Sequence, residues 1–314
     1  MSTDLNQKLV VTIASSAVLT LDEARDAFRE HGLEAYRKYQ RENQDRVLPK
    51  GPAFAFVKRL LAFNLRFPEE HPIEVILISH NDCDTGLRIM KSLAHYELSG
   101  PNGITRAAFV TDANPADFLR AYNSSLFLSK RAPDAKNAID SGFAAGTVLP
   151  SALNDDEDDD SLRIAFDFDG VLADSSSDRV YTAGGGLEAF NRNEIEHAKD
   201  PCQDGPLASL LKKLGHLRDL EFELQTKEPD YRRRLSLSII TARGIPGLER
   251  VVSTLRNWEV TIDRSFFLDG LDKGRILATL RPHIFFDDNL SPNLETAKDF
   301  TPCVHVPFSR KFSS

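Results

Sequence analysis

The segment Ile164–Asp174, with the sequence IAFDFDGVLAD, joins a strand-like apolar run to two aspartates, Asp167 and Asp169. The aspartates are two positions apart, so in an extended chain their side chains leave on the same face. Two carboxylates that close an apolar strand repel each other unless a cation lies nearby. The segment therefore predicts a strand that ends in a charged site.

Composition limits the class of protein to which this segment can belong. The chain has 314 residues, 41% hydrophobic and 27% charged, which is typical of a soluble globular protein with room for two domains. No apolar run approaches the ~18 residues of a membrane span, and the N-terminus does not resemble a secretory signal. The formal net charge is −8 and no cluster of Lys and Arg stands out. We therefore expect a cytoplasmic protein with neither a membrane nor a nucleic acid as partner.

An acidic run divides the chain into two halves. The segment Asn154–Asp160, NDDEDDD, has six acids in seven positions, which predicts a solvated linker. We expect one domain over residues 1–153 and a second over residues 161–314. The cysteines, Cys83, Cys202 and Cys303, are odd in number and far apart, which argues against a disulfide framework.

The two halves share short motifs in the same order. LVVTIASSAVL in the first half aligns with LRIAFDFDGVL in the second, and GPAFAFVKRL from Gly51 aligns with GPLASLLKKL from Gly205. Farther along, the segments that start at Ile104 and Ile262 align over 27 residues without a gap. The shared order and nearly constant offset predict an internal duplication.

Short β-branched runs alternate with helical patterns in each half. In the second half the expected strands are Leu162–Phe166, Leu235–Ile240, Ser265–Leu268, His283–Phe286 and Val304–Val306. This alternation predicts an α/β fold of two tandem Rossmann-like units, each with a parallel sheet flanked by helices. Ligands of such sheets bind beyond the carboxyl ends of the strands, which is where the two aspartates stand.

Further polar residues follow the other strands of the second half. Thr241 ends the second strand, Lys273 follows the third, and Asp287 and Asp288 follow the fourth. In this order, the pattern resembles the haloacid dehalogenase-like superfamily of phosphohydrolases. Taken singly, each has a less favoured alternative: Thr241 as a helix cap, Lys273 as a surface lysine, and the Asp pair as a turn or cap.

The resemblance implies a role for each of these residues. Asp167 would be the nucleophile, Asp169 the general acid and base, and Thr241 and Lys273 would hold the phosphoryl group. Mg²⁺ would be bound by Asp167, by the main-chain carbonyl of Asp169, and by Asp287 or Asp288, of which we favour Asp288. The remaining residues expected at the substrate are Phe168, Tyr181, Ala242 and Arg243, although Arg243 is equally compatible with a solvent-facing position.

The first half lacks this set of residues. Its alignment with the second half places Ala14 at Asp167, Ser16 at Asp169, Pro115 at Lys273, and Ser129 with Lys130 at the Asp pair. Ser79, at the position of Thr241, is the one motif-compatible side chain left. We expect the first unit to be non-catalytic and to serve as a structural or substrate-shaping partner.

A closer resemblance covers most of the chain. SSAVLTLDEARDAFREHGLEAYRKYQ, LPKGPAFAFVKRL, LRIAFDFDGVLAD, TARG and RPHIFFDDN are similar to the cytosolic type I 5′-nucleotidases. The resemblance implies Mg²⁺-dependent hydrolysis of nucleoside 5′-monophosphates, AMP or another purine nucleotide first among them, through an aspartyl-phosphate. A phosphatase for another small phosphate monoester and a non-catalytic nucleotide sensor are the alternatives. The sequence leaves open the base and sugar preference, allosteric regulation and a homo-oligomeric state.

A long insertion separates the first strand of the second half from its helix. Residues 175–206 are rich in glycine and polar residues, and we expect them to form a small cap over the phosphate. Tyr181 or Phe190 would then stack on a base, unless these rings pack within the insertion itself.

Overall fold

The computed structural model describes residues 5, 8–151, 153, 155–180 and 186–308. The chain forms two compact units, Met1–Phe143 and Ala144–Ser314. The boundary between them thus falls before the acidic segment 154–160, and the strand that lies between the two positions belongs to the second unit.

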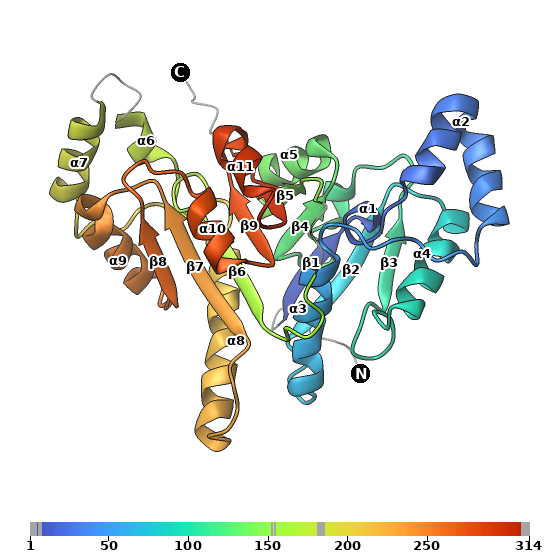
Figure 1. Cartoon of the computed structure of the whole chain (residues 1–314), viewed down its shortest axis with the longest axis horizontal. Helices are drawn as coiled ribbons and strands as arrows, with labels where there is room; N and C mark the ends of the chain where they lie inside the picture. The colour runs from blue at the N-terminus through green and yellow to red at the C-terminus, as the bar shows by residue number, and fades with distance from the viewer. Residues whose placement is uncertain (1–4, 6–7, 152, 154, 181–185, 309–314) are drawn as a thin grey trace. The chain divides into compact units, whose positions relative to one another are not determined.

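The first unit is a four-stranded parallel sheet flanked by helices (Figure 1). The strand order is β3-β2-β1-β4. The strands are β1 (Leu9–Ile13), β2 (Ile73–Ser79), β3 (Arg106–Phe109) and β4 (Leu126–Ser129). The helices are α1 (Ser15–Val18), α2 (Asp22–Glu42), α3 (Phe54–Arg66), α4 (Cys83–His95) and α5 (Ala132–Asp140), with a 3-10 turn, η2 (Pro115–Phe118).

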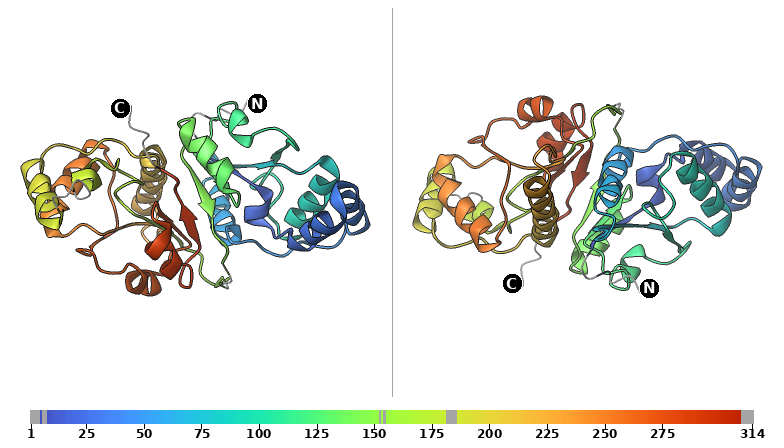
Figure 2. Two further views of the ribbon diagram at one scale, coloured as in Figure 1. Left: turned by 90° about the horizontal axis from the view of Figure 1, so that it is seen from above. Right: turned by 90° about the horizontal axis from the view of Figure 1, so that it is seen from below.

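The second unit is a six-stranded sheet in the order β5-β10-β9-β6-β7-β8. Its strands are β5 (Ala145–Val148), β6 (Leu162–Phe166), β7 (Leu235–Thr241), β8 (Arg264–Phe267), β9 (Ile284–Asp287) and β10 (Cys303–His305). Its helical segments are α6 (Ser176–Val180), α7 (Gly186–Glu196), α8 (Ala208–Lys227), η4 (Ile245–Gly247), α9 (Leu248–Asn257), α10 (Gly274–Leu280), η5 (Leu290–Leu294) and α11 (Glu295–Ala297). Helices α8 and α10 lie on opposite faces of this sheet (Figures 1 and 2).

The α/β class and the strands predicted in the second half are confirmed, with boundaries that differ by at most one residue. Every residue of β1 and β2 is buried, and so is all of β6 except Arg163. This continuous burial is expected of strands covered by helices on both faces. Strand β5 departs from the parallel pattern because it pairs antiparallel with β10.

Among the helices of the described residues, none has both the length and the apolar character that a membrane crossing requires.

The two units share one strand order. The order β3-β2-β1-β4 of the first unit corresponds to β8-β7-β6-β9 of the second, element for element along the chain. Both units also share a main-chain contact between the segment after the first strand and the Gly-Pro motif. Gly51 N–H donates to the carbonyl of Val18 over 2.7 Å, and Gly205 N–H donates to the carbonyl of Leu172 over 2.8 Å. The aligned Gly-Pro motifs of the sequence therefore occupy equivalent places in the two units.

The close approach of main-chain atoms to Gly205 predicts that its replacement destabilises the protein. A Cβ atom at Gly205 would lie 2.5 Å from the carbonyl oxygen of Ala173 and 2.7 Å from that of Val171, both main-chain atoms that cannot turn aside. We expect Gly205→Ala to lower the free energy of unfolding by about 1–3 kcal/mol. Chemical denaturation followed by circular dichroism measures the change.

Gly215→Ala is the matched control for this prediction. Gly215 lies within α8 of the same unit, and a Cβ there would meet the Val260 side chain at 3.4 Å, an ordinary contact. In a helix interior, alanine is more favourable than glycine by about 0.5–1 kcal/mol, so this variant should be slightly more stable than wild type. Equal denaturation midpoints for Gly205→Ala and Gly215→Ala would contradict the proposed clash at Gly205.

Candidate active site

The central strand β6 brings two acidic strand ends together. It lies between β7 and β9, and its register pairs Phe166 with Phe286 of β9. The next residue, Asp167, donates its main-chain N–H to the carbonyl of Phe286 over 2.8 Å. Asp167 and Asp287 therefore occupy adjacent positions at the carboxyl edge of the sheet.

Lys273 binds both of these carboxylates. Its Nζ lies 2.8 Å from Oδ2 of Asp167 and 2.8 Å from Oδ2 of Asp287, and the residue is 1% exposed. Burial lowers the pKa of the Lys273 ammonium, but the charges of Asp167 and Asp287 outweigh burial and raise the pKa above its ordinary value. Lys273 is a buried cation, so the alternative of a solvated surface lysine is wrong.

Three carboxylates converge beside this lysine. Asp167, Asp287 and Asp288 each offer one oxygen, and these oxygens lie within 4.8 Å of one another. Burial raises the pKa of Asp167 well above the usual range for aspartate. The charge of Lys273 lowers this pKa, and the charges of Asp287 and Asp288 raise it further. Three carboxylate oxygens thus lie close together beside one ammonium. The donor set therefore fits a hard divalent cation, which favours carboxylate oxygens.

Gly170 makes room for one of these acids. Its backbone is in the left-handed region, with φ at 72°, and a Cβ there would lie 2.2 Å from Oδ2 of Asp288. Glycine is thus required at position 170 both by its backbone and by the approach of Asp288. Asp287 is held by the loop that follows it, since Asn289 N–H donates to its Oδ1 over 2.8 Å and Asn293 Nδ2 lies 3.3 Å from the same oxygen.

Asp169 faces a different cation from Asp167. Arg243 Nε donates to Oδ2 of Asp169 over 2.7 Å, and Arg243 Nη2 donates to Oδ1 over 2.7 Å. Burial lowers the pKa of the Arg243 guanidinium, but Asp169 and Glu194 outweigh it and raise the pKa above its ordinary value. Arg243 is 3% exposed, so it does not face solvent as one alternative held.

Thr241 is the last residue of β7, and Ala242 joins it to Arg243. Thr241 is buried, and its Oγ1 accepts the main-chain N–H of Arg243 over 3.1 Å. The carbonyl of Ala242 accepts the N–H of Gly270 over 2.9 Å. These bonds fix the turn that leads from β7 to Arg243.

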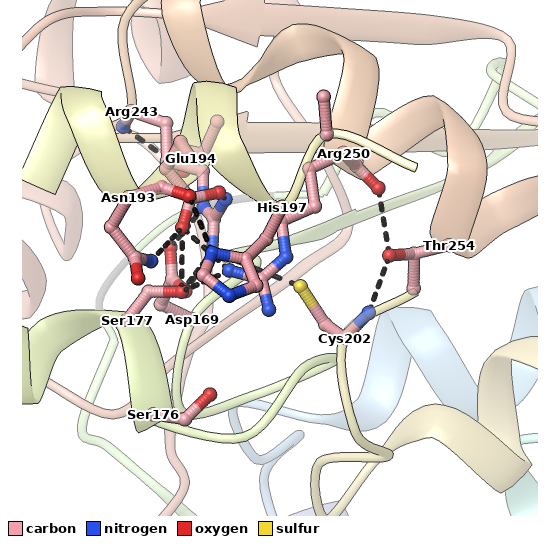
Figure 3. A network of polar contacts seen from close by, with 12 residues as sticks. Asp169, Ser176, Ser177, Asn193, Glu194, His197, Cys202, Arg243, Arg250 and Thr254 are labelled. Atoms are coloured by element: carbon pink, nitrogen blue, oxygen red, sulfur yellow. Dashed lines mark hydrogen bonds and ion pairs between the residues drawn. The ribbon is translucent and has the colours of Figure 1, made fainter. Parts of the chain in front are cut away.

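The insertion contributes a buried acid that the sequence did not point to. Glu194 of α7 is fully buried and pairs with Arg243 through Oε2, while its Oε1 accepts from Arg250 Nη1 and from Ser177 Oγ, each over 2.8 Å (Figure 3). A single glutamate in an amphipathic helix carries no signal that separates it from a solvated one. Glu194, Arg250 and Ser177 were therefore missed.

The aromatic candidates pack inside the unit. Phe168 is fully buried, and the centre of the Arg243 guanidinium lies 5.0 Å from its ring, so the Phe168 side chain offers no surface to a substrate. Phe190 is also buried, with its ring 5.5 Å from the same guanidinium. Phe190 thus packs against Arg243, which follows β7 and lies outside the insertion. Tyr181 lies outside the described residues.

The strand ends of the first unit carry hydroxyl and amide groups instead of carboxylates. Ser15 Oγ and Ser79 Oγ are 2.8 Å apart, and Asn81 Nδ2 donates to both. At the position of Asp287, Ser129 donates to Asp134 Oδ2 over 2.9 Å. Within the part of the chain that the structure describes, the acidic cluster of the second unit is the one group of acids close enough to hold a metal ion.

Comparison with known proteins gives one consistent result. A family model described as 5′-nucleotidase matches residues 1–312. Human cytosolic 5′-nucleotidase 1B is 32% identical to this chain over 312 residues, which are 98% of this chain and 50% of the human protein. The chain thus spans about half the length of the curated relative that it matches. No solved structure was found to match it.

The acidic cluster predicts metal binding that depends on Asp288. Loss of one of three carboxylates should weaken binding of Mg²⁺ or Mn²⁺ by about tenfold or more, because the remaining ligands hold less charge. Isothermal titration of metal into wild type and Asp288→Asn measures this. Asp219→Asn, an exposed aspartate of α8, is the matched control and should bind metal like wild type. Unchanged binding by Asp288→Asn would exclude Asp288 as a ligand.

Proposed function

The chain belongs to the 5′-nucleotidase family, and we propose that it hydrolyses nucleoside 5′-monophosphates to nucleoside and phosphate. The observation that carries this proposal is the cluster of buried Asp167, Lys273 and Asp287 with half-buried Asp288, in a chain that matches the family along its length. Phosphate monoesters resist hydrolysis strongly, so their cleavage needs a nucleophile, positive charge and a proton donor together.

In the first step Asp167 is the proposed nucleophile. One carboxylate oxygen of Asp167 forms a bond to phosphorus while the bond from phosphorus to the ribose 5′ oxygen breaks. Asp169 supplies the proton that the departing oxygen needs, which gives the free nucleoside and an aspartyl-phosphate. Lys273, already 2.8 Å from the Asp167 carboxylate, compensates the charge of the nucleophile and of the phosphoryl oxygens.

In the second step water replaces Asp167 on phosphorus. The water oxygen attacks phosphorus and its proton passes to Asp169, while the bond to the Asp167 oxygen breaks. This returns Asp167 as a carboxylate and Asp169 in its protonated form. Thr241 is proposed to donate its hydroxyl proton to a phosphoryl oxygen, because its Oγ1 already accepts from Arg243 N–H. Main-chain N–H groups of Ala242 and Arg243 are the expected neighbours of the same phosphate.

Mg²⁺ is the proposed metal. The residues that would hold it are Asp167, Asp287, Asp288 and the main-chain carbonyl of Asp169. When bound, it would supply positive charge that draws electron density from the phosphoryl group. That positive charge would favour the ionised form of Asp167, which its role as nucleophile requires.

The broader assignments follow the same reasoning. We infer that both units derive from a haloacid dehalogenase-like ancestor, since they share a strand order and aligned motifs, and that the first is non-catalytic because it lacks the acids and the lysine. The human relative is named as a cytosolic protein, and we propose a cytoplasmic location here as well. A purine nucleotide such as AMP is the proposed substrate.

A substrate panel tests this function. We expect phosphate release from AMP, IMP, GMP, CMP and UMP, fastest with a purine, in the presence of Mg²⁺ and its loss when a chelator is added. Sugar phosphates serve as the comparison. Preference for them over every nucleotide would support the alternative phosphatase, and binding of nucleotide without any release of phosphate would support a sensor.

A single substitution tests the nucleophile. Asp167→Asn keeps the size of the side chain but removes its charge, so we expect turnover to fall by at least about 10³-fold while the circular dichroism spectrum is unchanged. Asp219→Asn is again the control and should retain full activity. Turnover of Asp167→Asn near the wild-type rate would rule out the assigned role.

A further inference from the structure

Asp169 is held by a network that reaches into the insertion. Both of its oxygens accept from Arg243, each over 2.7 Å, and Arg243 Nη1 pairs with Glu194 of α7. Figure 3 shows these side chains converging from three separate parts of the unit. The Arg243 and Glu194 side chains are 1% and 0% exposed, so neither is screened by water.

The network is complete without any ligand. Arg250 Nη1 and Ser177 Oγ donate to the second oxygen of Glu194, so two acids and two arginines balance in charge. The rings of Phe168 and Phe190 lie 5.0 and 5.5 Å from the Arg243 guanidinium and restrict its movement. Arg243 therefore serves an internal partner in this structure and is not poised on an open anion site.

This geometry conflicts with the proposed work of Asp169 unless one contact breaks. A general acid must direct one oxygen toward the departing group, but both Asp169 oxygens point at Arg243. If one Asp169 oxygen breaks its bond to Arg243, the other oxygen can keep its bond and anchor the side chain. This remaining bond has a fixed position only if the Arg243 guanidinium is itself held, and Glu194 holds it through Nη1.

We propose that Glu194 is a positioning residue that acts through Arg243 on Asp169, and so couples the insertion to proton transfer. The proposal rests on the function proposed above. It assigns Glu194 to delivery of the proton to the ribose oxygen and leaves attack on phosphorus to Asp167 and Lys273. The consequence is that Glu194 matters for a poor leaving group and not for a good one.

Two substrates separate these roles. The nucleoside alkoxide leaves only with a proton, whereas the p-nitrophenolate of p-nitrophenyl phosphate leaves without one. Release of each leaving group is followed in a single turnover with enzyme in excess, so that only the first step is measured. For Glu194→Gln we expect release from AMP to slow by about 10- to 100-fold and release of p-nitrophenol to stay within about twofold of wild type.

Two further variants make the test specific. Arg243→Lys keeps the charge but loses the planar fork that donates to both oxygens of Asp169 while it pairs with Glu194, so we expect it to slow release from AMP and to spare release of p-nitrophenol in the same way. Ser253→Ala removes a 2.9 Å bond from Ser253 Oγ to the carbonyl of Ala198, which ties the insertion to α9 away from Arg243. This control should leave both rates unchanged.

The outcomes are distinct. An equal loss on both substrates in Glu194→Gln would mean a structural role and overturn the proposal, as would unchanged rates on both. Failure of the proposed function is visible separately, because wild type itself would then release no nucleoside from AMP. Slowing on AMP alone, in Glu194→Gln and Arg243→Lys but not in Ser253→Ala, supports the proposal.

Discussion

The second unit is organised around a concentration of negative charge at the end of β6. Four aspartates stand at the ends of β6 and β9, and three of them, Asp167, Asp169 and Asp287, are buried, where an ionised carboxylate is costly without a positive partner. The structure meets this constraint with two separate cations, because Lys273 compensates Asp167 and Asp287 while Arg243 compensates Asp169. Beside Lys273 three carboxylate oxygens also converge within 4.8 Å of one another, which is the donor set that fits a divalent cation.

This division sorts two neighbouring aspartates into two environments. Strand β6 ends at Phe166, so the alternation that places Asp167 and Asp169 on one face no longer governs them, and Gly170 turns the chain just beyond. Asp167 joins the metal-fitting cluster, and Asp169 joins the network of the insertion. Two identical side chains two residues apart can thus take up different chemical roles because their partners come from different elements.

Sequence reasoning succeeded where the signal was local. The apolar strands, the acids that follow β6 and β9, and Lys273 before α10 are each written in a few consecutive residues, and the structure places them at one edge of the sheet. Sequence reasoning did not find contacts between residues that are far apart in the chain. Glu194 and Arg243 are 49 positions apart, and Arg243 and Asp169 are 74 positions apart. The antiparallel pairing of β5 was likewise invisible, since short apolar strands do not encode their direction.

The shared strand order has an evolutionary consequence. Functional sites commonly cost stability, and a buried group of like charges is an instance of that trade-off. The first unit keeps the architecture but carries serines and an asparagine at the corresponding strand ends, so it is relieved of this electrostatic burden. We infer that hydroxyl and amide groups can stand at these strand ends because the first unit does not have to hold a cluster of like charges.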